Sequence, residues 1–311
     1  MLQHEGSHPD MQGQFPNLYL VGSAKAGTSA LHAVLSRHPS IFAPEGIKEP
    51  NFMAYEGSMP SLNGPEDPLH GAGHSITDRD RYLELYHPAG NKPWRLDASP
   101  IYLIHPDAPA RIRHYAPASR IMIILRNPTD CAFSMYCMMR RMRREPITNF
   151  MKAFRESSRR RRAGWEYAWD YADRYHFAPM LRRYMSAFDP DQMLILNYDD
   201  WKNDNEATLG VVAGFLGIDP KGYPPARIRV NTAPSRRSLL WSGTLASRIR
   251  PLVSKATPLI PLSVRKSFSQ SYFDQPIRLG KKDRAILNDY YRDDLSEVEE
   301  LLGWDLRKWK N

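Results

Sequence analysis

The sequence predicts an α/β fold, with a central, mostly parallel β-sheet flanked by helices on both faces. Short apolar strands alternate with helical patterns over residues 18–216, and this order is typical of βαβ units. The clearest strand, residues 120–125, is almost wholly apolar, as expected for a parallel strand covered on both sides. A glycine-containing turn at residues 22–29 leads from the first strand into the first helix.

The elements of the first part follow from their periodicity. They are a strand at 18–21, a helix at 28–37 that stops at His38-Pro39, a short strand near 94–97 and a helix at 107–115. Between them, residues 56–78 are rich in Gly, Pro, Ser and Asp and have no period. They predict a long surface loop of the kind that forms a lid or binds a substrate.

The elements of the second part continue the alternation. They are a strand at 120–125, helices at 129–144 and 167–187, a strand at 193–196, and a helix at 206–216 with Gly217 as its C-cap. A basic Pro-containing loop follows at 226–238, and then a Pro-rich stretch of ambiguous structure at 251–262. One final amphipathic helix is expected, because the following side chains share a face before Gly303: Leu287, Tyr291, Leu295, Val298 and Leu302.

Composition limits the class of protein. We expect a flexible tail at residues 1–16 and one domain at 17–311, because no strong linker divides the 311 residues. The net charge of +9 favours an anionic ligand. No apolar run approaches the length that spans a bilayer, and the polar N-terminus does not resemble a signal peptide. Cys131 and Cys137 lack metal-ligand spacing and indicate reduced thiols, so we expect a cytoplasmic protein.

Residues 22–29, Gly-Ser-Ala-Lys-Ala-Gly-Thr-Ser, form the most informative motif. A Walker A loop places its Lys after the second Gly, whereas here Lys25 precedes Gly27. Glycines let the backbone approach a ligand closely, and the helix N-terminus adds N–H donors and a positive dipole end. The motif therefore predicts a phosphate site that does not serve ATP or GTP hydrolysis. The alternative, in which Thr28 and Ser29 only cap the helix, leaves Lys25 without a role.

A second polar cluster follows the strand at 120–125. Arg126-Asn127-Pro128 comes at the carboxyl end of that strand, where ligands bind in open parallel sheets. Ser134 follows eight residues after Arg126. A guanidinium fork and a hydroxyl suit a phosphate group. Taken alone, this Arg more often pairs with a carboxylate at a strand end.

The two motifs together resemble those of sulfotransferases that use 3′-phosphoadenosine-5′-phosphosulfate (PAPS). The loop with His38-Pro39 resembles that family's 5′-phosphosulfate loop, and Leu125 to Tyr136 resembles its 3′-phosphate motif. Further matches, in family order, are Lys48-Glu-Pro50 with Phe52, Asp97-Ala-Ser-Pro-Ile-Tyr102, Tyr175-His-Phe-Ala-Pro-Met-Leu181 and Phe215-Leu-Gly-Ile218. The Lys-Glu-Pro element resembles the branch of heparan sulfate N- and O-sulfotransferases and their bacterial relatives.

The resemblance implies a P-loop-type sulfotransferase fold and a role for each matching residue. The 5′-phosphosulfate would be held by Lys25, Ala26, Gly27, Thr28 and Ser29. The 3′-phosphate would be held by Arg126 and Ser134. Lys25 and Glu49 would be catalytic, with Glu49 as the base that deprotonates the acceptor hydroxyl or amine. The family's late basic loop usually has Lys and Gly, whereas this chain offers Arg227, Arg229, Arg236 and Arg237; we assign Arg236 and Arg237 to closure over PAPS.

The chemistry agrees with these roles. Sulfuryl transfer resembles phosphoryl transfer, and Lys25 with the helix N-terminus can stabilise the leaving phosphate. The transferred group carries less charge than a terminal phosphate, so we expect no metal requirement. Glu49 has an alternative role as a surface carboxylate paired with Lys48. His32 and His105 are rival bases.

Two features bear on the acceptor, which we expect to be a small molecule or a saccharide. The basic runs at 140–144 and 159–162 predict solvated helix faces or, alternatively, an electrostatic funnel for anions. The aromatic run of Trp165, Tyr167, Trp169 and Tyr171 has i, i+2 spacing, so its members cannot all face one side of a helix. Some are expected in the acceptor cleft and others in the core.

Two other functions stay open from the residues alone. A P-loop nucleotide kinase or NTPase would need a Lys after the second Gly and a Walker B Asp, and neither is evident. A non-catalytic protein that binds polyanions or nucleic acid fits the charge, but no nucleic-acid reader motif accompanies it, so we expect no nucleic-acid partner. The sequence carries no signal for an oligomeric state.

Overall fold

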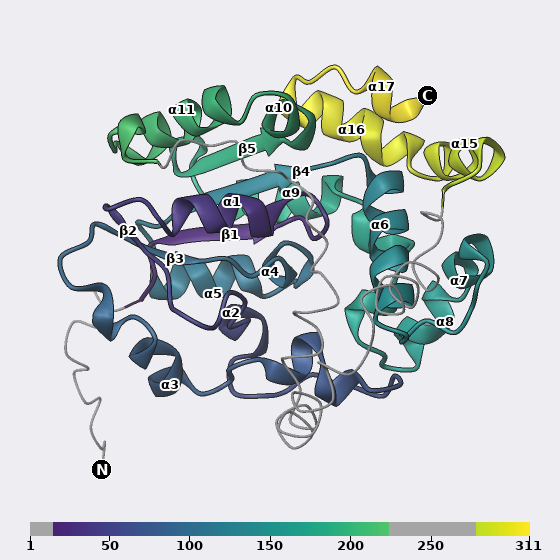
Figure 1. Cartoon of the computed structure of the whole chain (residues 1–311), viewed down its shortest axis with the longest axis horizontal. Helices are drawn as coiled ribbons and strands as arrows, with labels where there is room; N and C mark the ends of the chain where they lie inside the picture. The colour runs from purple at the N-terminus through teal and green to yellow at the C-terminus, as the bar shows by residue number, and fades with distance from the viewer. Residues whose placement is uncertain (1–14, 224–277) are drawn as a thin grey trace, which may run out of the picture. The chain divides into compact units, whose positions relative to one another are not determined.

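The computed structural model describes residues 15–223 and 278–311. Residues 15–223 and 281–311 belong to one compact unit, shown in Figure 1. The predictions for residues 1–14, for the basic and Pro-rich segments at 226–262, and for Arg236 and Arg237 lie outside the described residues. Phe15, which the sequence prediction places in the tail, is buried and stacks on Tyr115 with ring centroids 4.4 Å apart.

The centre of this unit is a five-stranded, wholly parallel sheet with the strand order β2-β3-β1-β4-β5. The strands are β1 Leu18–Gly22, β2 Ile41–Phe42, β3 Trp94–Asp97, β4 Arg120–Leu125 and β5 Met193–Asn197. Every residue of β1 is buried, as are five of the six residues of β4. The predicted parallel sheet is confirmed. Only β2 was not predicted, because two residues carry no periodic signal.

Helices flank the sheet on both sides (Figure 1). Those up to the end of β4 are α1 Thr28–Leu35, α2 Phe52–Tyr55, α3 Arg79–Glu84, α4 Ile101–Ile104 and α5 Ala108–Tyr115. Those after β4 are α6 Pro128–Arg141, α7 Phe150–Arg155, α8 Ser157–Arg162, α9 Ala178–Ala187, α10 Tyr198–Asn203 and α11 Asn205–Leu216. The last are α15 Lys281–Tyr290, α16 Arg292–Leu302 and α17 Arg307–Lys310. No helix in the described ranges combines the length and the apolar character needed to cross a membrane.

The helix predicted over 167–187 is wrong in its first half. Only α9 is helical, and two 3₁₀ turns at Tyr167–Trp169 and Asp173–Tyr175 precede it. Oδ1 of Asp170 accepts hydrogen bonds from the N–H groups of Ala172 and Asp173. Such local side-chain bonds compete with helical ones. Pro179 then lies in the first turn of α9, where a missing N–H is tolerated.

The final helix is also corrected, because it consists of two helices that meet at Tyr291. The Tyr291 hydroxyl donates to the carbonyls of Tyr171 and Ala172, and the side chain is fully buried. This anchoring holds the break between α15 and α16. The predicted apolar face is otherwise confirmed, since Leu287 and Leu295 are fully buried on it. Gly303 follows α16 in the left-handed conformation, with φ of 65°.

Candidate active site

The two predicted phosphate motifs meet at one edge of the sheet. Strands β1 and β4 are parallel neighbours, so the loop after Gly22 and the Arg126 segment leave the sheet side by side. The chain crosses from β1 to β2 and β3 on one side, and continues through β4 and β5 on the other. The pair β1/β4 is therefore the point where the strand order reverses, which is the usual ligand crevice of an open α/β sheet.

The loop between β1 and α1 adopts left-handed backbone at two positions. Gly27, directly before α1, has φ of 91°, and a Cβ there would come within 3.1 Å of the Tyr198 ring. Lys25 has φ of 70°, although it is not a glycine; such geometry costs roughly 1–3 kcal/mol and is concentrated at functional sites. Thr28 is buried at the start of α1, whereas Ser29 is exposed.

The Lys25 side chain turns back toward α6, where its Nζ lies 3.4 Å from the Met138 sulfur. Burial is the largest cause that lowers the pKa of this amine, to about 8, and the charges of Arg141, Arg126 and Arg174 act in the same direction. Lys25 thus lies in a cationic environment, with no carboxylate paired to it among the described residues. This arrangement favours an anionic ligand.

Arg126 connects β4 to the loop. Its Nη1 donates to the Lys25 carbonyl at 3.0 Å, and its guanidinium lies 4.7 Å from the centroid of the Tyr198 ring. The alternative partner, a carboxylate, is also present, but Asp130 is 3.9 Å away. Ser134 is half-buried in the second turn of α6. The structure therefore places Arg126 and the loop in direct contact, with Ser134 on the helix that Lys25 contacts.

Glu49 reaches the loop through its neighbour Lys48. Lys48 Nζ donates to Glu49 Oε1 at 2.7 Å and lies 3.4 Å from the Thr28 hydroxyl. The ion pair that the alternative interpretation predicts is thus present, and it lies against the phosphate loop. The Glu49 side chain keeps 39% of its exposure, so it is accessible from solvent.

A buried network that the sequence interpretation left without a role supports the segment after Glu49. Asp97, at the end of β3, accepts hydrogen bonds from Ser99 and Tyr82 at 2.6 Å and from Tyr102 at 2.7 Å. Burial raises the pKa of Asp97 to about 6, and the hydrogen bonds oppose this shift. The position of Asp97 at the carboxyl end of a strand was the feature of the sequence that could have indicated a role near the site.

The partners of Asp97 extend this network to the backbone. Ser99 Oγ accepts from the N–H of Asn51 at 3.1 Å, and the Tyr102 hydroxyl accepts from the N–H of Met53 at 3.2 Å. The carboxylate of Asp97 therefore fixes residues 51–53 through two side chains. Glu49 lies just before this fixed segment.

The two rival bases, His32 and His105, are both partly buried, and burial lowers the pKa of each imidazole. Burial is the largest cause that lowers the pKa of His32, to about 4, and the charge of Lys48 adds to it. Burial also lowers the pKa of His105, whose ring meets the edge of Tyr55 at 5.6 Å between centroids. Both rings are consequently neutral near pH 7.

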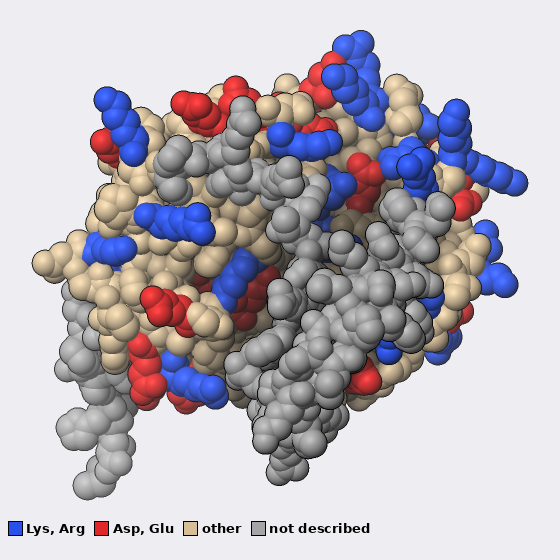
Figure 2. Space-filling view, in the orientation of Figure 1, with Lys and Arg blue, Asp and Glu red and all other residues tan. Residues whose placement is uncertain are grey.

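The basic runs are only partly solvated, which corrects the prediction of solvated helix faces. Arg144 is buried and donates to Asp67 at 2.5 Å and to Glu166 at 3.0 Å. Arg160 is buried and donates to both oxygens of Glu145, at 2.5 and 3.0 Å. On the face shown in Figure 2, acidic and basic side chains are interspersed. These Arg side chains therefore join distant segments of the chain.

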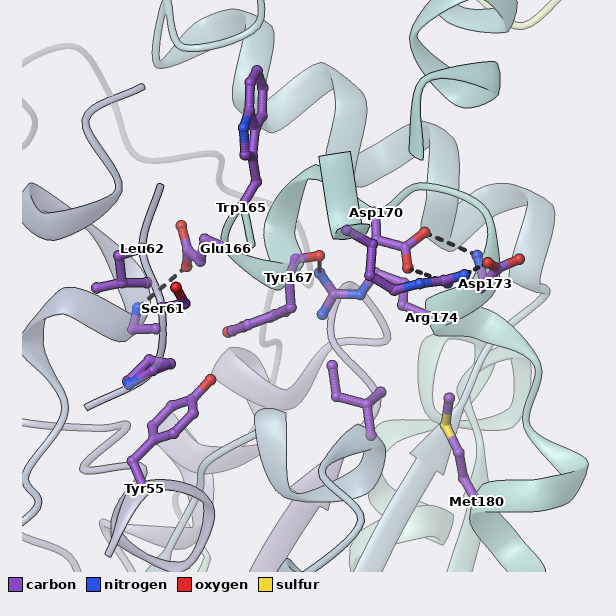
Figure 3. A pocket seen from close by; sticks show the side chains of 14 residues that line it. Tyr55, Ser61, Leu62, Trp165, Glu166, Tyr167, Asp170, Asp173, Arg174 and Met180 are labelled. Carbon is purple, nitrogen blue, oxygen red and sulfur yellow. Dashed lines mark hydrogen bonds and ion pairs between the residues drawn. The ribbon is translucent and has the colours of Figure 1, made fainter. Parts of the chain in front are cut away.

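A cavity of about 340 Å³ lies beside this buried network (Figure 3). Its lining comes from the loop at 56–78, from Tyr55, Ile104 and Met180, and from the segment at 161–174. The structure divides the aromatic run between this cavity and the core, and that the cavity receives an acceptor stays a prediction. Trp165 and Tyr167 line the cavity, whereas Trp169 and Tyr171 are fully buried in the core. The prediction that the 56–78 loop contributes to a binding pocket agrees with its place in the lining.

Comparison with known proteins agrees with this geometry. Residues 15–232 match the family model described as "Sulfotransferase domain". The chain belongs to the sulfotransferase family. Residues 15–232 therefore form a sulfotransferase domain.

One curated protein and two solved structures illustrate what this sulfotransferase is similar to. It is 24% identical to human bifunctional heparan sulfate N-deacetylase/N-sulfotransferase 1 over 95% of its length, but spans only 31% of that protein. The sulfotransferase from Alicyclobacillus acidocaldarius has the same fold, with a TM-score of 0.73 and 24% identity over 96% of this chain and 99% of that chain. The sulfotransferase domain from the curacin biosynthetic pathway superposes with a TM-score of 0.51 and 14% identity, over 93% and 98% of the two chains.

The described residues contain no group of three or more His, Cys, Asp or Glu side chains arranged to hold a metal ion. That a metal is not required stays a prediction.

Proposed function

We propose that this sulfotransferase uses PAPS as its donor and transfers the sulfuryl group to a hydroxyl or amine of an acceptor bound in the cavity beside Tyr167. The observation that carries the proposal is the convergence of Lys25 and Arg126 on the crevice between β1 and β4. When bound, PAPS supplies the sulfuryl group. The proposal also rests on the family match.

The residues at the crevice fit a donor with two phosphate positions. Lys25 is a half-buried cation whose side chain, among the described residues, bonds to the Met138 sulfur and to no carboxylate. The Ser23 hydroxyl, in the same loop, is buried and has no hydrogen-bond partner among the described residues. Both groups have capacity left for anionic oxygens. Arg126, directly after β4, and Ser134, on α6, would hold the 3′-phosphate.

The residues of the site would have separate tasks in the proposed reaction. The loop backbone and Lys25 stabilise negative charge on the leaving phosphate. Glu49 holds the proton that the acceptor loses, provided that the acceptor enters from the cavity. The Asp97 network orients the segment next to Glu49, and the cavity walls exclude water from part of the acceptor.

The acceptor class is a proposal as well. The human relative's name refers to heparan sulfate, but this chain corresponds to less than a third of that protein. Aromatic walls pack against the C–H faces of sugar rings and also stack on aromatic rings, so the cavity supports a saccharide or a small ring-bearing molecule.

A thermal-shift panel tests the donor assignment. Adenosine 3′,5′-bisphosphate without Mg²⁺ should raise the melting temperature, with a stabilisation that grows as RT ln(1 + [L]/Kd). ATP with Mg²⁺ serves as the comparison. Stabilisation by ATP-Mg alone, with no effect of the bisphosphate, would overturn the proposal in favour of a nucleotide kinase or NTPase.

A further inference from the structure

Five charged side chains line the cavity, and most of them have fixed partners. Arg161 Nη1 donates to Asp170 at 3.1 Å and also to Asp173. Asp170 Oδ1 accepts from two backbone N–H groups, and Asp173 Oδ1 accepts from the hydroxyl of Tyr290 at 2.6 Å. These three charges form a closed set at the rim, where 52% of the Arg161 side chain is exposed.

Glu166 is also fully engaged. Its Oε2 accepts from Arg144 Nη1 at 3.0 Å, and its Oε1 accepts from the N–H of Ala72 at 3.2 Å. The side chain is almost fully buried. All three carboxylates of the lining therefore have donors of their own.

Arg174 differs from these residues. It is only 5% exposed, yet it lines the cavity, and Figure 3 shows its guanidinium directed toward Tyr167. One nitrogen donates to the Tyr167 carbonyl at 3.1 Å, and the guanidinium carbon lies 4.5 Å from the centroid of that ring. Its Nε is buried without a hydrogen-bond partner in the part of the chain that the structure describes, and no ion pair to it is formed there.

A buried guanidinium with unused donors is costly unless a ligand completes it. A planar guanidinium can donate two parallel hydrogen bonds to the two oxygens of a carboxylate. The lining next to it offers the ring faces of Tyr55 and Tyr167 and the apolar side chains of Leu62, Ile104 and Met180. A volume of about 340 Å³ suits a small molecule or one part of a larger one.

Building on the proposed function, we propose that Arg174 binds a carboxylate of the acceptor, and so selects acceptors that carry a hydroxyl or amine and a carboxylate around one ring. The donor side is served by Lys25 and Arg126, which contact each other at the crevice. No residue of the loop at 22–29 lines the cavity. Arg174 is thus assigned to the acceptor and not to the group in transfer.

The ring can belong to an aromatic compound or to a sugar, and two pairs of probes distinguish these sources. The aromatic pair is 4-hydroxyphenylacetate and 4-methylphenol; the sugar pair is methyl β-D-glucuronide and methyl β-D-glucoside. Binding is measured by calorimetry with adenosine 3′,5′-bisphosphate at saturation. In at least one pair, the carboxylate should bind about 10- to 100-fold more tightly than its neutral partner, as one charge-assisted contact predicts.

Three variants test the residue. Arg174→Gln should bring the two members of the favoured pair to within about threefold in affinity. Arg174→Lys keeps the charge without the fork, should retain part of the preference, and covers the case in which the Gln variant does not fold. Arg182→Gln is the control, because it removes the same charge from an exposed position on α9 outside the lining; its preference should equal that of the unaltered protein.

The outcomes separate this inference from the proposed function. If the bisphosphate does not bind the unaltered protein, the donor assignment fails. If it binds but neither pair shows a preference for the carboxylate, the role of Arg174 is wrong. An equal loss of affinity for both members of a pair in Arg174→Gln would show that Arg174 only balances the charges of Glu166 and Asp170, and would also overturn the inference.

Discussion

The phosphate loop and the cavity that we propose for the acceptor are held in place by different kinds of contact. The loop depends on local backbone geometry between β1 and α1, with positive φ at Lys25 and Gly27. The cavity depends on buried ion pairs between distant segments, such as Arg144 with Asp67, 77 residues apart. The structure of the phosphate loop is thus specified by a short local motif. The shape of the cavity is specified by long-range packing, so it can change while the loop motif stays the same.

The largest effect should come from Glu49→Gln, which separates chemistry from donor binding. A lost general base typically lowers turnover by about 10²- to 10⁴-fold, whereas bisphosphate affinity should stay unchanged because the phosphate loop is intact. The matched control is Glu45→Gln, at an exposed position four residues earlier. The readouts are kcat for sulfuryl transfer and a calorimetric Kd. Full activity in Glu49→Gln would remove this residue from the mechanism.

Asp67→Asn tests whether buried ion pairs hold the cavity. Asp67 is fully buried and accepts from Arg144, from the Trp169 indole at 2.7 Å and from the N–H of Glu166 at 2.7 Å. Breaking such a pair should lower the free energy of unfolding by about 3 kcal/mol, measured by urea titration. The control Asp80→Asn changes an exposed carboxylate. An unchanged midpoint in Asp67→Asn would contradict the difference drawn between the two regions.

Lys25→Met tests the donor side directly. Loss of one charge-assisted contact should weaken bisphosphate binding by about 10- to 100-fold. The melting temperature of the free protein should not fall, because burial of the amine is unfavourable to its charged form. The exposed Lys202→Met on α10 is the control. Equal affinities in the two variants would show that Lys25 does not contact the donor.

The pH dependence of donor affinity should be the smallest effect. Burial lowers the pKa of Lys25 to about 8, so the amine of the free protein loses its proton as the pH rises through 8. Since the anion binds the charged form, the bisphosphate Kd should rise by at most tenfold per pH unit above pH 8. Below pH 7 it should not depend on this group. Lys25→Met should abolish the dependence between pH 7 and 9.5, and a slope that persists there would assign it to another group.

The parts of the fold that were predictable are those with local signals. The apolar run of β4, the helical spacing of α1 and the glycine after α11 each determine their structure through neighbouring residues. The phosphate loop and Arg126 could be placed together from sequence, because both follow strands of one parallel sheet. The order of the strands in the sheet and the register of their pairing are set by contacts between distant segments, so they could be determined only from the structure.

The acceptor side could not be predicted in the same way. Arg144 and Arg160 occur in charge runs that are typical of solvated helices, and only their long-range partners Asp67 and Glu145 make burial favourable. The Asx turn at Asp170 interrupts the segment predicted as a helix, and the helix begins only at Ala178. As a result, Arg174 carried no functional signal in the sequence, although it lines the cavity.

A crystal structure of the complex with adenosine 3′,5′-bisphosphate tests the central claim most directly. The account predicts the 5′-phosphate within hydrogen-bond distance of Lys25 and the N–H groups of the loop at 22–29, and the 3′-phosphate against Arg126 and Ser134. The cavity beside Arg174 should stay open toward the 5′ end of the nucleotide. A bisphosphate bound inside that cavity, or away from the crevice between β1 and β4, would contradict the account.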